Sequence, residues 1–228
     1  MIKVLKSGFF SSIQDKGRFG YGAYGVPKSG VMDMYSAELA NTLLDNPADA
    51  AVLEITMTGP ELRFDEESHI IIVGADISPS INGESIKNNK IYHIKKGFIL
   101  KFGKLKFGLR AYIAVKGGFK SEIVLGSQSY YKQIMAVNSI ASGDVLYSNQ
   151  SKITSKPTKL FSKLKPIDFT SEVINAIKGP EYELLSNEQR NKLKSKVFKI
   201  SKFYNRMAYQ LLPEVDNNLK PILTGPVL

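Results

Sequence analysis

Residues 52–76 read VLEITMTGPELRFDEESHIIIVGAD, and this stretch decides the fold class of the chain. In Val52–Thr56, Glu61–Phe64 and His69–Val73 the apolar residues alternate with a period of two, which is typical of half-buried β-strands. Gly59-Pro60 lies between the first two segments, where a turn is required. The stretch therefore predicts three consecutive strands joined by short connections.

The same pattern extends outward from this stretch. Further segments of period two are Ile91–Ile94, Phe98–Phe102 and Ala111–Val115. Glycines mark the intervening turns at Gly83, Gly97, Gly103, Gly108, Gly117-Gly118 and Gly143-Asp144. Strands that follow one another at such short intervals favour an antiparallel, mainly β domain, either barrel-like or sandwich-like.

Two short helices are expected to interrupt the strands. Asp33–Leu44 carries an apolar stripe, begins with Asp33 as a plausible N-cap and stops before Pro47. The second helix runs from about Ser186 to Ser195, where Ser186 and Gln189 have the spacing of a capping box.

The composition also predicts how the chain is divided. Residues 151–166 are rich in Ser, Lys and Pro, which indicates a linker. We expect a β-barrel-like domain with a glycine-rich loop over residues 1–150 and a smaller β domain over residues 167–228.

The bulk composition excludes several classes of function. The chain has no Cys, which removes disulfides, thiolate nucleophiles and Cys-based metal sites. The net charge is +10, but the excess Lys gathers between Lys152 and Lys202 without an RNA-binding motif or zinc finger. This favours a solvated basic face or an anionic partner surface over nucleic acid. Met1–Ser12 is too short an apolar run for a signal peptide or membrane span, so we expect a cytoplasmic protein without membrane contact.

Residues 13–30, IQDKGRFGYGAYGVPKSG, are the most unusual stretch. Five glycines leave backbone N–H groups free to approach an anion, and Arg18 could add a bidentate fork for carboxylate or phosphate. The spacing fits neither a Walker loop nor a dinucleotide-binding fingerprint. A tightly turning connection without a ligand is the alternative. Gly126-Ser127-Gln128-Ser129 likewise could bind an anion or form a Ser-rich turn.

Acidic and histidine side chains offer few further candidates. Four carboxylates lie near glycines or strand ends, where each could act as a base or instead serve as a cap, turn or surface group: Asp15, Asp33, Glu54 and Asp76. His69 and His93 lie inside expected strands, so structural roles are favoured and a His-rich metal site is excluded by number.

The motifs of this sequence, taken together, resemble one family. The opening motif is Ile13-Gln14-Asp15, Gly17-Arg18, Gly20-Tyr21, Gly25-Val26, Ser29-Gly30 and Met32-Asp33, and later ordered matches include Gly59-Pro60, Gly74-Ala75-Asp76, Leu125-Gly126-Ser127, Gly179-Pro180 and Arg206-Met207. These residues resemble the family that includes the C-type subunit of 5-oxoprolinase, allophanate hydrolase subunit 2, the KipI antagonist and biotin-dependent carboxyltransferase. The resemblance implies a cyclophilin-like β-barrel architecture.

The same resemblance implies an activity and partners. A B-type, KipI-like subunit and an A-type subunit would join this chain to convert 5-oxo-L-proline to L-glutamate at the expense of ATP, with Mg shared in the complex. Two alternatives stay open. One is a non-catalytic antagonist that binds a KipI-like kinase inhibitor, and the other is a carboxyltransferase component served by biotin from a separate carrier.

The resemblance also suggests site residues in this chain. Asp15 and Arg18 are the expected catalytic pair, with Asp15 as orienter or base and Arg18 as anion clamp. No metal ligand is expected. The expected substrate-binding residues are Gln14, Gly20, Tyr21, Ser29, Ser127, Ser129 and Arg206.

Three departures from the family pattern bear on these expectations. Residues 135–140, MAVNSI, replace the usual Gly-Gly and Gly-Arg pair, and residues 206–211, RMAYQL, replace RMGYRL. Both changes would weaken anion binding if these residues contact substrate. The family also continues beyond the segment matching Ile222–Leu228 into a Gly-rich stretch and final strands, so an incomplete second barrel is expected.

Overall fold

The computed structural model describes residues 1–135, 139–149, 172–204 and 209–216. The chain divides into two compact units, Met1–Tyr21 with Lys28–Leu164 and Gly22–Pro27 with Lys165–Leu228, which we describe separately as unit 1 and unit 2. The expected fold class is confirmed, because strands dominate and, in the described ranges, α-helices occur only at the two expected places. The expected linker 151–166 lies outside the described residues, so the expected domain boundaries stay predictions.

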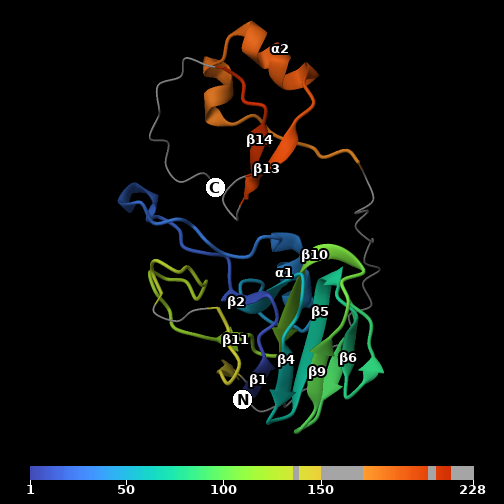
Figure 1. The fold of residues 1–228 in the computed structure, drawn as a ribbon. Helices are drawn as coiled ribbons and strands as arrows, with labels where there is room; N and C mark the ends of the chain where they lie inside the picture. The colour runs from blue at the N-terminus through green and yellow to red at the C-terminus, as the bar shows by residue number, and fades with distance from the viewer. Residues whose placement is uncertain (136–138, 150–171, 205–208, 217–228) are drawn as a thin grey trace. The chain divides into compact units, whose positions relative to one another are not determined.

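Unit 1 contains two antiparallel sheets that face each other (Figure 1). The first has the strand order β11-β12-β1-β4-β9-β6-β7 and the second the order β2-β3-β10-β5-β8. Both sheets are open at their edges, so the expected barrel-like domain is built as two facing sheets. The strands of the first sheet are β1 (Ile2–Lys6), β4 (Glu61–Phe64), β6 (Pro79–Ile81), β7 (Glu84–Ser85), β9 (Ile99–Phe102), β11 (Phe119–Lys120) and β12 (Val145–Ser148). Those of the second are β2 (Phe10–Gln14), β3 (Val52–Thr56), β5 (Ser68–Asp76), β8 (Tyr92–Ile94) and β10 (Phe107–Val115).

The period-two pattern sorts the apolar residues of the second sheet onto two buried faces. On β5, Ile70 and Ile72 belong to the main core between the sheets, whereas Ile71 and Val73 belong to a second core on the outer face. β3 and β10 divide their side chains in the same way. Three neighbouring strands are thus covered on both sides, which explains their nearly unbroken apolar sequence.

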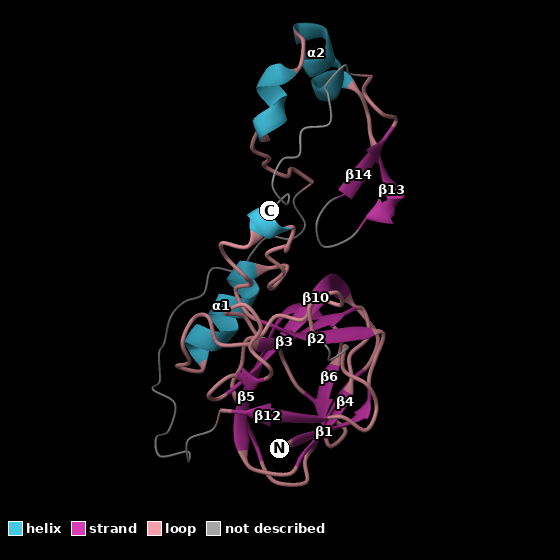
Figure 2. Ribbon diagram, turned by 90° about the vertical axis from the view of Figure 1, so that its left-hand side faces the viewer, coloured by secondary structure: helices cyan, strands magenta, loops and turns pink. Residues whose placement is uncertain are grey.

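Helix α1 (Met34–Leu43) covers the outer face of this second sheet (Figure 2). Asp33 is its N-cap, as expected, and its carboxylate accepts a hydrogen bond from Ser36 N at 3.0 Å. Ala37, Ala40 and Leu44 pack against Tyr112 and Ala114 of β10 and against β5. The helix therefore completes the second core.

Among the described residues, unit 2 contains two 3₁₀-helices, η1 (Gly22–Tyr24) and η2 (Pro180–Leu184), helix α2 (Asn187–Ser195) and a hairpin of β13 (Lys199–Tyr204) with β14 (Tyr209–Leu212). The capping box expected at Ser186 and Gln189 is present. Ile200, Leu211 and Leu212 of the hairpin are exposed. The 3₁₀-helices carried no clear sequence signal.

Candidate functional site

Strand β2 and the loop that follows it deliver the first predicted site residues. Gln14, at the end of β2, is 1% exposed, and its Nε2 donates to Ser12 Oγ at 2.9 Å and to Tyr130 O at 3.3 Å. Its Oε1 is buried without a hydrogen-bond partner among the described residues. Gln14 therefore anchors β2 to the segment around Tyr130.

The carboxylate of Asp15 accepts hydrogen bonds from four donors. They are Ser127 Oγ at 2.6 Å, Ser129 Oγ at 2.5 Å, Gln128 N at 2.6 Å and Gly17 N at 2.8 Å. Burial alone would raise the pKa of Asp15, but the hydrogen bonds from the serines and the two backbone N–H groups outweigh it and lower the pKa. A carboxylate so saturated is a weak base, so the geometry suits the orienting role better than the role of general base.

The two predicted serines are buried at 1% and 0% exposure and are fully engaged with this carboxylate. Besides donating to Asp15, Ser129 Oγ accepts from Asp15 N at 2.9 Å, and Ser127 Oγ accepts from Ser129 N at 3.0 Å. Their hydroxyls thus bind the loop after β2 to residues 127–129. Contact of these serines with a substrate stays a prediction.

Arg18 is 2% exposed and points into the protein. Its Nε donates to Val124 O at 3.1 Å and its Nη2 to Ser129 O at 2.6 Å, while Nη1 is buried without a partner among the described residues. Burial lowers the pKa of Arg18, and the negative charge of Asp15 opposes this effect. Two of the three guanidinium nitrogens are therefore committed to backbone carbonyls, and contact of Arg18 with an anion stays a prediction.

Two glycines close the base of the predicted glycine-rich loop. Arg18 N donates to Lys28 O at 2.6 Å and Val31 N donates to Asp15 O at 2.9 Å, so residues 15–18 and 28–31 run side by side. We call this paired segment the glycine stem. A Cβ on Gly17 would lie 2.4 Å from Lys28 O and one on Gly30 would lie 2.8 Å from Lys16 O, and both residues have φ near +90°.

The remaining predicted residues fall in or beyond this stem. Ser29 lies within it, with its carbonyl oxygen 3.0 Å from the position of a Cβ on Gly17. Gly20 and Tyr21 follow the stem, and no hydrogen bond within the described part of the chain joins either of them to Asp15 or Arg18. Arg206 lies outside the described residues, as does the centre of the departing segment 135–140.

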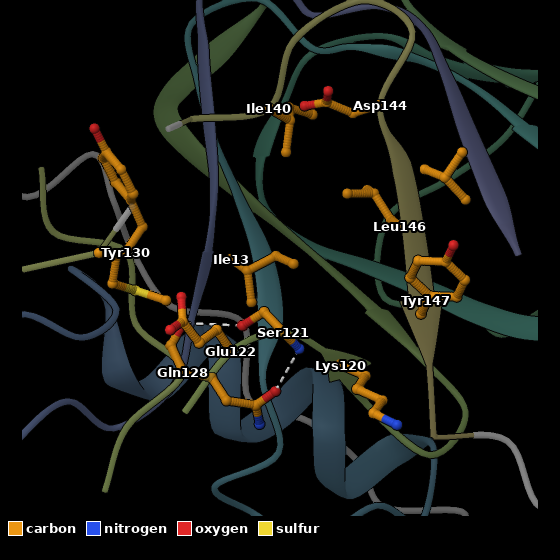
Figure 3. Close-up of a pocket in the computed structure, with 12 residues that line it drawn as sticks. Ile13, Lys120, Ser121, Glu122, Gln128, Tyr130, Ile140, Asp144, Leu146 and Tyr147 are labelled. Atoms are coloured by element: carbon orange, nitrogen blue, oxygen red, sulfur yellow. Dashed lines mark hydrogen bonds between the residues drawn. The ribbon is translucent and has the colours of Figure 1, made fainter. Parts of the chain in front are cut away.

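A cavity of about 310 Å³ is lined by residues that are close in sequence to Asp15 and the two serines. Figure 3 shows its lining residues. Ile13, Gln128 and Tyr130, the sequence neighbours of Asp15 and the two serines, form one wall. Ile140 and Leu146 line another part of it, and Lys120 and Glu122 extend in opposite directions from Ser121. Asp15 and Arg18 are not among its lining residues, so the predicted pair stands behind the cavity wall.

The sequence analysis missed a buried polar cluster around Glu54 on the outer face of the second sheet. Glu54, considered as a cap, turn or surface group, is instead 1% exposed on β3, where its carboxylate accepts from Met32 N at 2.8 Å and lies 3.7 Å from Arg110 Nε. Tyr112 donates to Glu54 and accepts from Asp33 N at 2.8 Å. Burial, followed by the Glu54 charge, raises the pKa of Tyr112. This cluster holds the chain between the glycine stem and α1.

The two histidines proved to be cross-strand neighbours. His69 on β5 stands opposite His93 on β8, with ring centroids 5.0 Å apart. Burial, the His93 charge and Lys116 lower the pKa of His69. The described residues contain no group of three or more His, Cys, Asp or Glu placed to hold a metal ion. In this part of the chain no helix combines the length and apolar character needed to cross a bilayer.

These features define a mainly β protein in which two facing sheets carry a cavity and a buried polar cluster. The chain belongs to the family "Carboxyltransferase domain, subdomain A and B", which matches residues 24–226. The family expected from the sequence motifs is thereby confirmed.

Proteins of two kinds contain a region similar to this chain. The chain is 26% identical over 219 residues to the C-type subunit of 5-oxoprolinase from Escherichia coli K12, covering 94% of this chain and 69% of that protein. It is 38% identical over 158 residues to urea amidolyase of Lachancea kluyveri, covering 67% of this chain and 9% of that protein. The chain thus spans less than a tenth of the urea amidolyases that it matches.

Solved structures agree with this assignment. The crystal structure of TTHA0988 has a TM-score of 0.81 and 28% identity, covering 97% of this chain and 81% of that chain. The crystal structure of the Kluyveromyces lactis urea amidolyase has a TM-score of 0.76 and 31% identity, covering 93% of this chain and 14% of that chain.

Proposed function

We propose that this chain is the C-type subunit of an ATP-dependent 5-oxoprolinase, which converts 5-oxo-L-proline to L-glutamate together with A-type and B-type subunits. One observation carries the proposal. The similarity to the corresponding Escherichia coli 5-oxoprolinase protein covers 94% of this chain and 69% of that separate polypeptide, whereas the urea amidolyase matches cover less than a tenth of much longer proteins.

The chemistry of the proposed reaction requires activation of a lactam. An amide carbonyl is a poor electrophile, and transfer of a phosphoryl group from ATP to its oxygen, with release of ADP, makes the carbon open to attack by water. Water then adds to this carbon, the C–N bond breaks as the nitrogen is protonated, and hydrolysis of the resulting acyl phosphate releases phosphate and glutamate. Positive charge and backbone donors must stabilise the phosphoryl oxygens. We place ATP and its Mg²⁺ in the complex, shared with the A-type and B-type subunits. In this chain the candidate for a phosphate contact is Arg18 Nη1, which lacks a partner among the described residues. Because Arg18 stands behind the cavity wall, such a contact would require this wall to open.

The proposal is tested by reconstitution. The full chain is mixed with A-type and B-type 5-oxoprolinase subunits, and glutamate release from 5-oxo-L-proline is followed with and without ATP. We expect ATP-dependent glutamate formation that stops when this chain is omitted. Equal rates with and without the chain would refute the proposal.

A second candidate is carboxyl transfer. The 38% identity to urea amidolyase and the description of the matching family favour it. In that case biotin would arrive on a separate carrier. Transfer of labelled carboxyl from a carboxybiotinylated carrier to an acceptor, in the presence of the chain, is the expected result. Absence of transfer under conditions where the reconstituted set makes glutamate would reject this candidate.

A further inference from the structure

Exposed apolar side chains gather at one end of the second sheet. Phe9 is 69% exposed, Met57 42%, Phe107 44% and Leu109 38%. Phe9 N donates to the carbonyl of Thr58, the residue after Met57, at 3.2 Å, and Met57 N donates to Leu109 O at 3.0 Å. The residues therefore lie beside one another on or at the ends of β2, β3 and β10. We call these four residues the apolar strip.

The strip continues a row of the main core. Met57 and Leu109 stand two residues beyond Ile55 and Ala111, which face each other across β3 and β10 and are 0% exposed in the main core. The pairing of β3 with β10 continues in the same register to Met57 and Leu109, although β10 is irregular against β5 between Phe107 and Ala111. Leu109 therefore stands at the uncovered end of this row. An apolar row that runs out of a core in this way is a surface suited to a second apolar surface.

Met57, which lies on this surface, has a strained backbone conformation. Its φ is +63°, a left-handed conformation that glycine or asparagine adopts far more readily than methionine. Glycine at this position would relieve the strain and remove an exposed apolar side chain. Keeping methionine here opposes stability and solubility, which fits a side chain that a partner covers.

The border of the strip is basic. Residues 101–110, KFGKLKFGLR, contain four cationic residues and no acidic one. Lys104 forms no ion pair with any described residue, and Lys106 Nζ is 3.9 Å from Asp76. A partner that carries carboxylates at its rim would complement this border.

We propose that the apolar strip, with Lys104 and Lys106, docks a companion protein that presents an apolar face bordered by carboxylates. A protein is favoured over an anionic membrane because Glu61 and Asp76 stand among the lysines, where an evenly charged lipid surface would repel them. Naming the companion as the B-type subunit rests on the proposed function, whereas the chemistry of the surface does not.

The test measures the affinity of the full chain for a B-type 5-oxoprolinase subunit by titration calorimetry. A double variant, Phe9→Ser with Leu109→Ser, is expected to weaken binding by about 100-fold, because truncation of central apolar contacts dominates interface energetics. Ile123→Ser is the matched control, since Ile123 is 68% exposed but outside the strip, and it should leave the affinity within about twofold. Lys104→Glu should weaken binding by about tenfold and reduce its dependence on salt.

Met57→Gly separates docking from folding. This variant relieves the positive φ, so the free chain should unfold at an unchanged or higher temperature while the affinity falls by about tenfold. An affinity unchanged in both the double variant and Met57→Gly would overturn the docking surface. Failure of the wild-type chain to bind the B-type subunit would refute that subunit as the companion. Strip-dependent binding to vesicles with about 30% phosphatidylserine would show that the strip binds a membrane and not a protein.

The outcomes separate this inference from the proposed function. Strip-dependent binding without glutamate formation by the wild-type set would support the surface and refute the 5-oxoprolinase assignment. Normal turnover and affinity in the strip variants would refute the surface and leave the assignment intact.

Discussion

Asp15 connects two segments that are more than a hundred residues apart. Its carboxylate accepts hydrogen bonds from both serines and from Gln128 N, and its backbone N–H donates to Ser129 Oγ. Arg18 adds two hydrogen bonds from the same loop to the carbonyls of Val124 and Ser129. These contacts fix one side of the cavity wall, so they position the surface that a small molecule would meet.

Replacing Asp15 should therefore cost stability as well as activity. Asp15→Asn puts an amide N–H₂ against donors that need an acceptor, and we expect a loss of about 3 kcal/mol in the free energy of unfolding, measured by urea denaturation. Asp49→Asn at an exposed position is the matched control and should change it by less than about 0.5 kcal/mol. Equal stabilities of the two variants would show that the hydrogen bonds contribute little.

The lowered pKa of Asp15 gives its contribution a defined pH window. A group whose folded pKa lies below its unfolded value stabilises the fold at pH values above the unfolded pKa and loses this effect as pH falls through the folded pKa. The stability difference between wild type and Asp15→Asn should be constant above about pH 5 and shrink below about pH 4. Denaturation series across this range test it, and a difference that grows on acidification would contradict it.

At the scale of elements, the glycine stem shows where sequence patterns carry information and where they do not. The run of glycines predicted tight turns or an anion loop, and Gly17 and Gly30 are needed because the backbones at residues 15–18 and 28–31 touch. The carbonyls that satisfy Arg18 come from residues 124 and 129, and no local pattern indicates them. The role of Arg18 as an anion clamp therefore stays a prediction, and its two backbone carbonyl partners could not be predicted from the sequence.

Two glycines with nearly equal positive φ angles allow a matched comparison. Gly17 and Gly20 have φ of +91° and +88°, but a Cβ on Gly17 would meet Lys28 O at 2.4 Å while one on Gly20 meets open space. Gly20→Ala should cost about 1 kcal/mol of unfolding free energy from strain, and Gly17→Ala should cost at least about 3 kcal/mol because the stem must separate. Calorimetric melting of both variants gives the comparison, and equal costs would show that the close approach yields easily.

For the whole molecule, period-two alternation and turn residues were sufficient to predict the fold class, and the cap residues Asp33 and Ser186 marked the starts of both α-helices. The juxtaposition of Gln14, Asp15 and Arg18 with Ser127 and Ser129 was anticipated only through the family resemblance, because pairing across more than a hundred residues leaves no local trace. Glu54 was misjudged because a lone acid in an apolar strand reads as a surface group until its partners on β10 and before α1 are known.

The two units should differ in protection from hydrogen exchange. β3, β5 and β10 are covered on both faces, so their amides should exchange only through global unfolding, with protection of about 5–15 kcal/mol. The β13–β14 hairpin exposes Ile200, Leu211 and Leu212, so it should open locally at a few kcal/mol at most. Mass-spectrometric exchange on the full chain measures both, and uniform protection would contradict this difference.

The double burial of β3, β5 and β10 has a consequence for how the chain finds its strand pairing. In a sheet with one solvent-exposed face, a shift of a strand's register by one residue is destabilising because polar side chains enter the core. Here a slip on β5 would merely exchange one set of isoleucines for another, so hydrophobicity discriminates poorly between the two alignments. Glu54 on β3 and Tyr112 on β10 supply the missing discrimination. A slip of β3 would place the Glu54 carboxylate between the sheets, and a slip of β10 would move the Tyr112 hydroxyl away from Asp33 N. These two polar side chains thus act as alignment marks for folding.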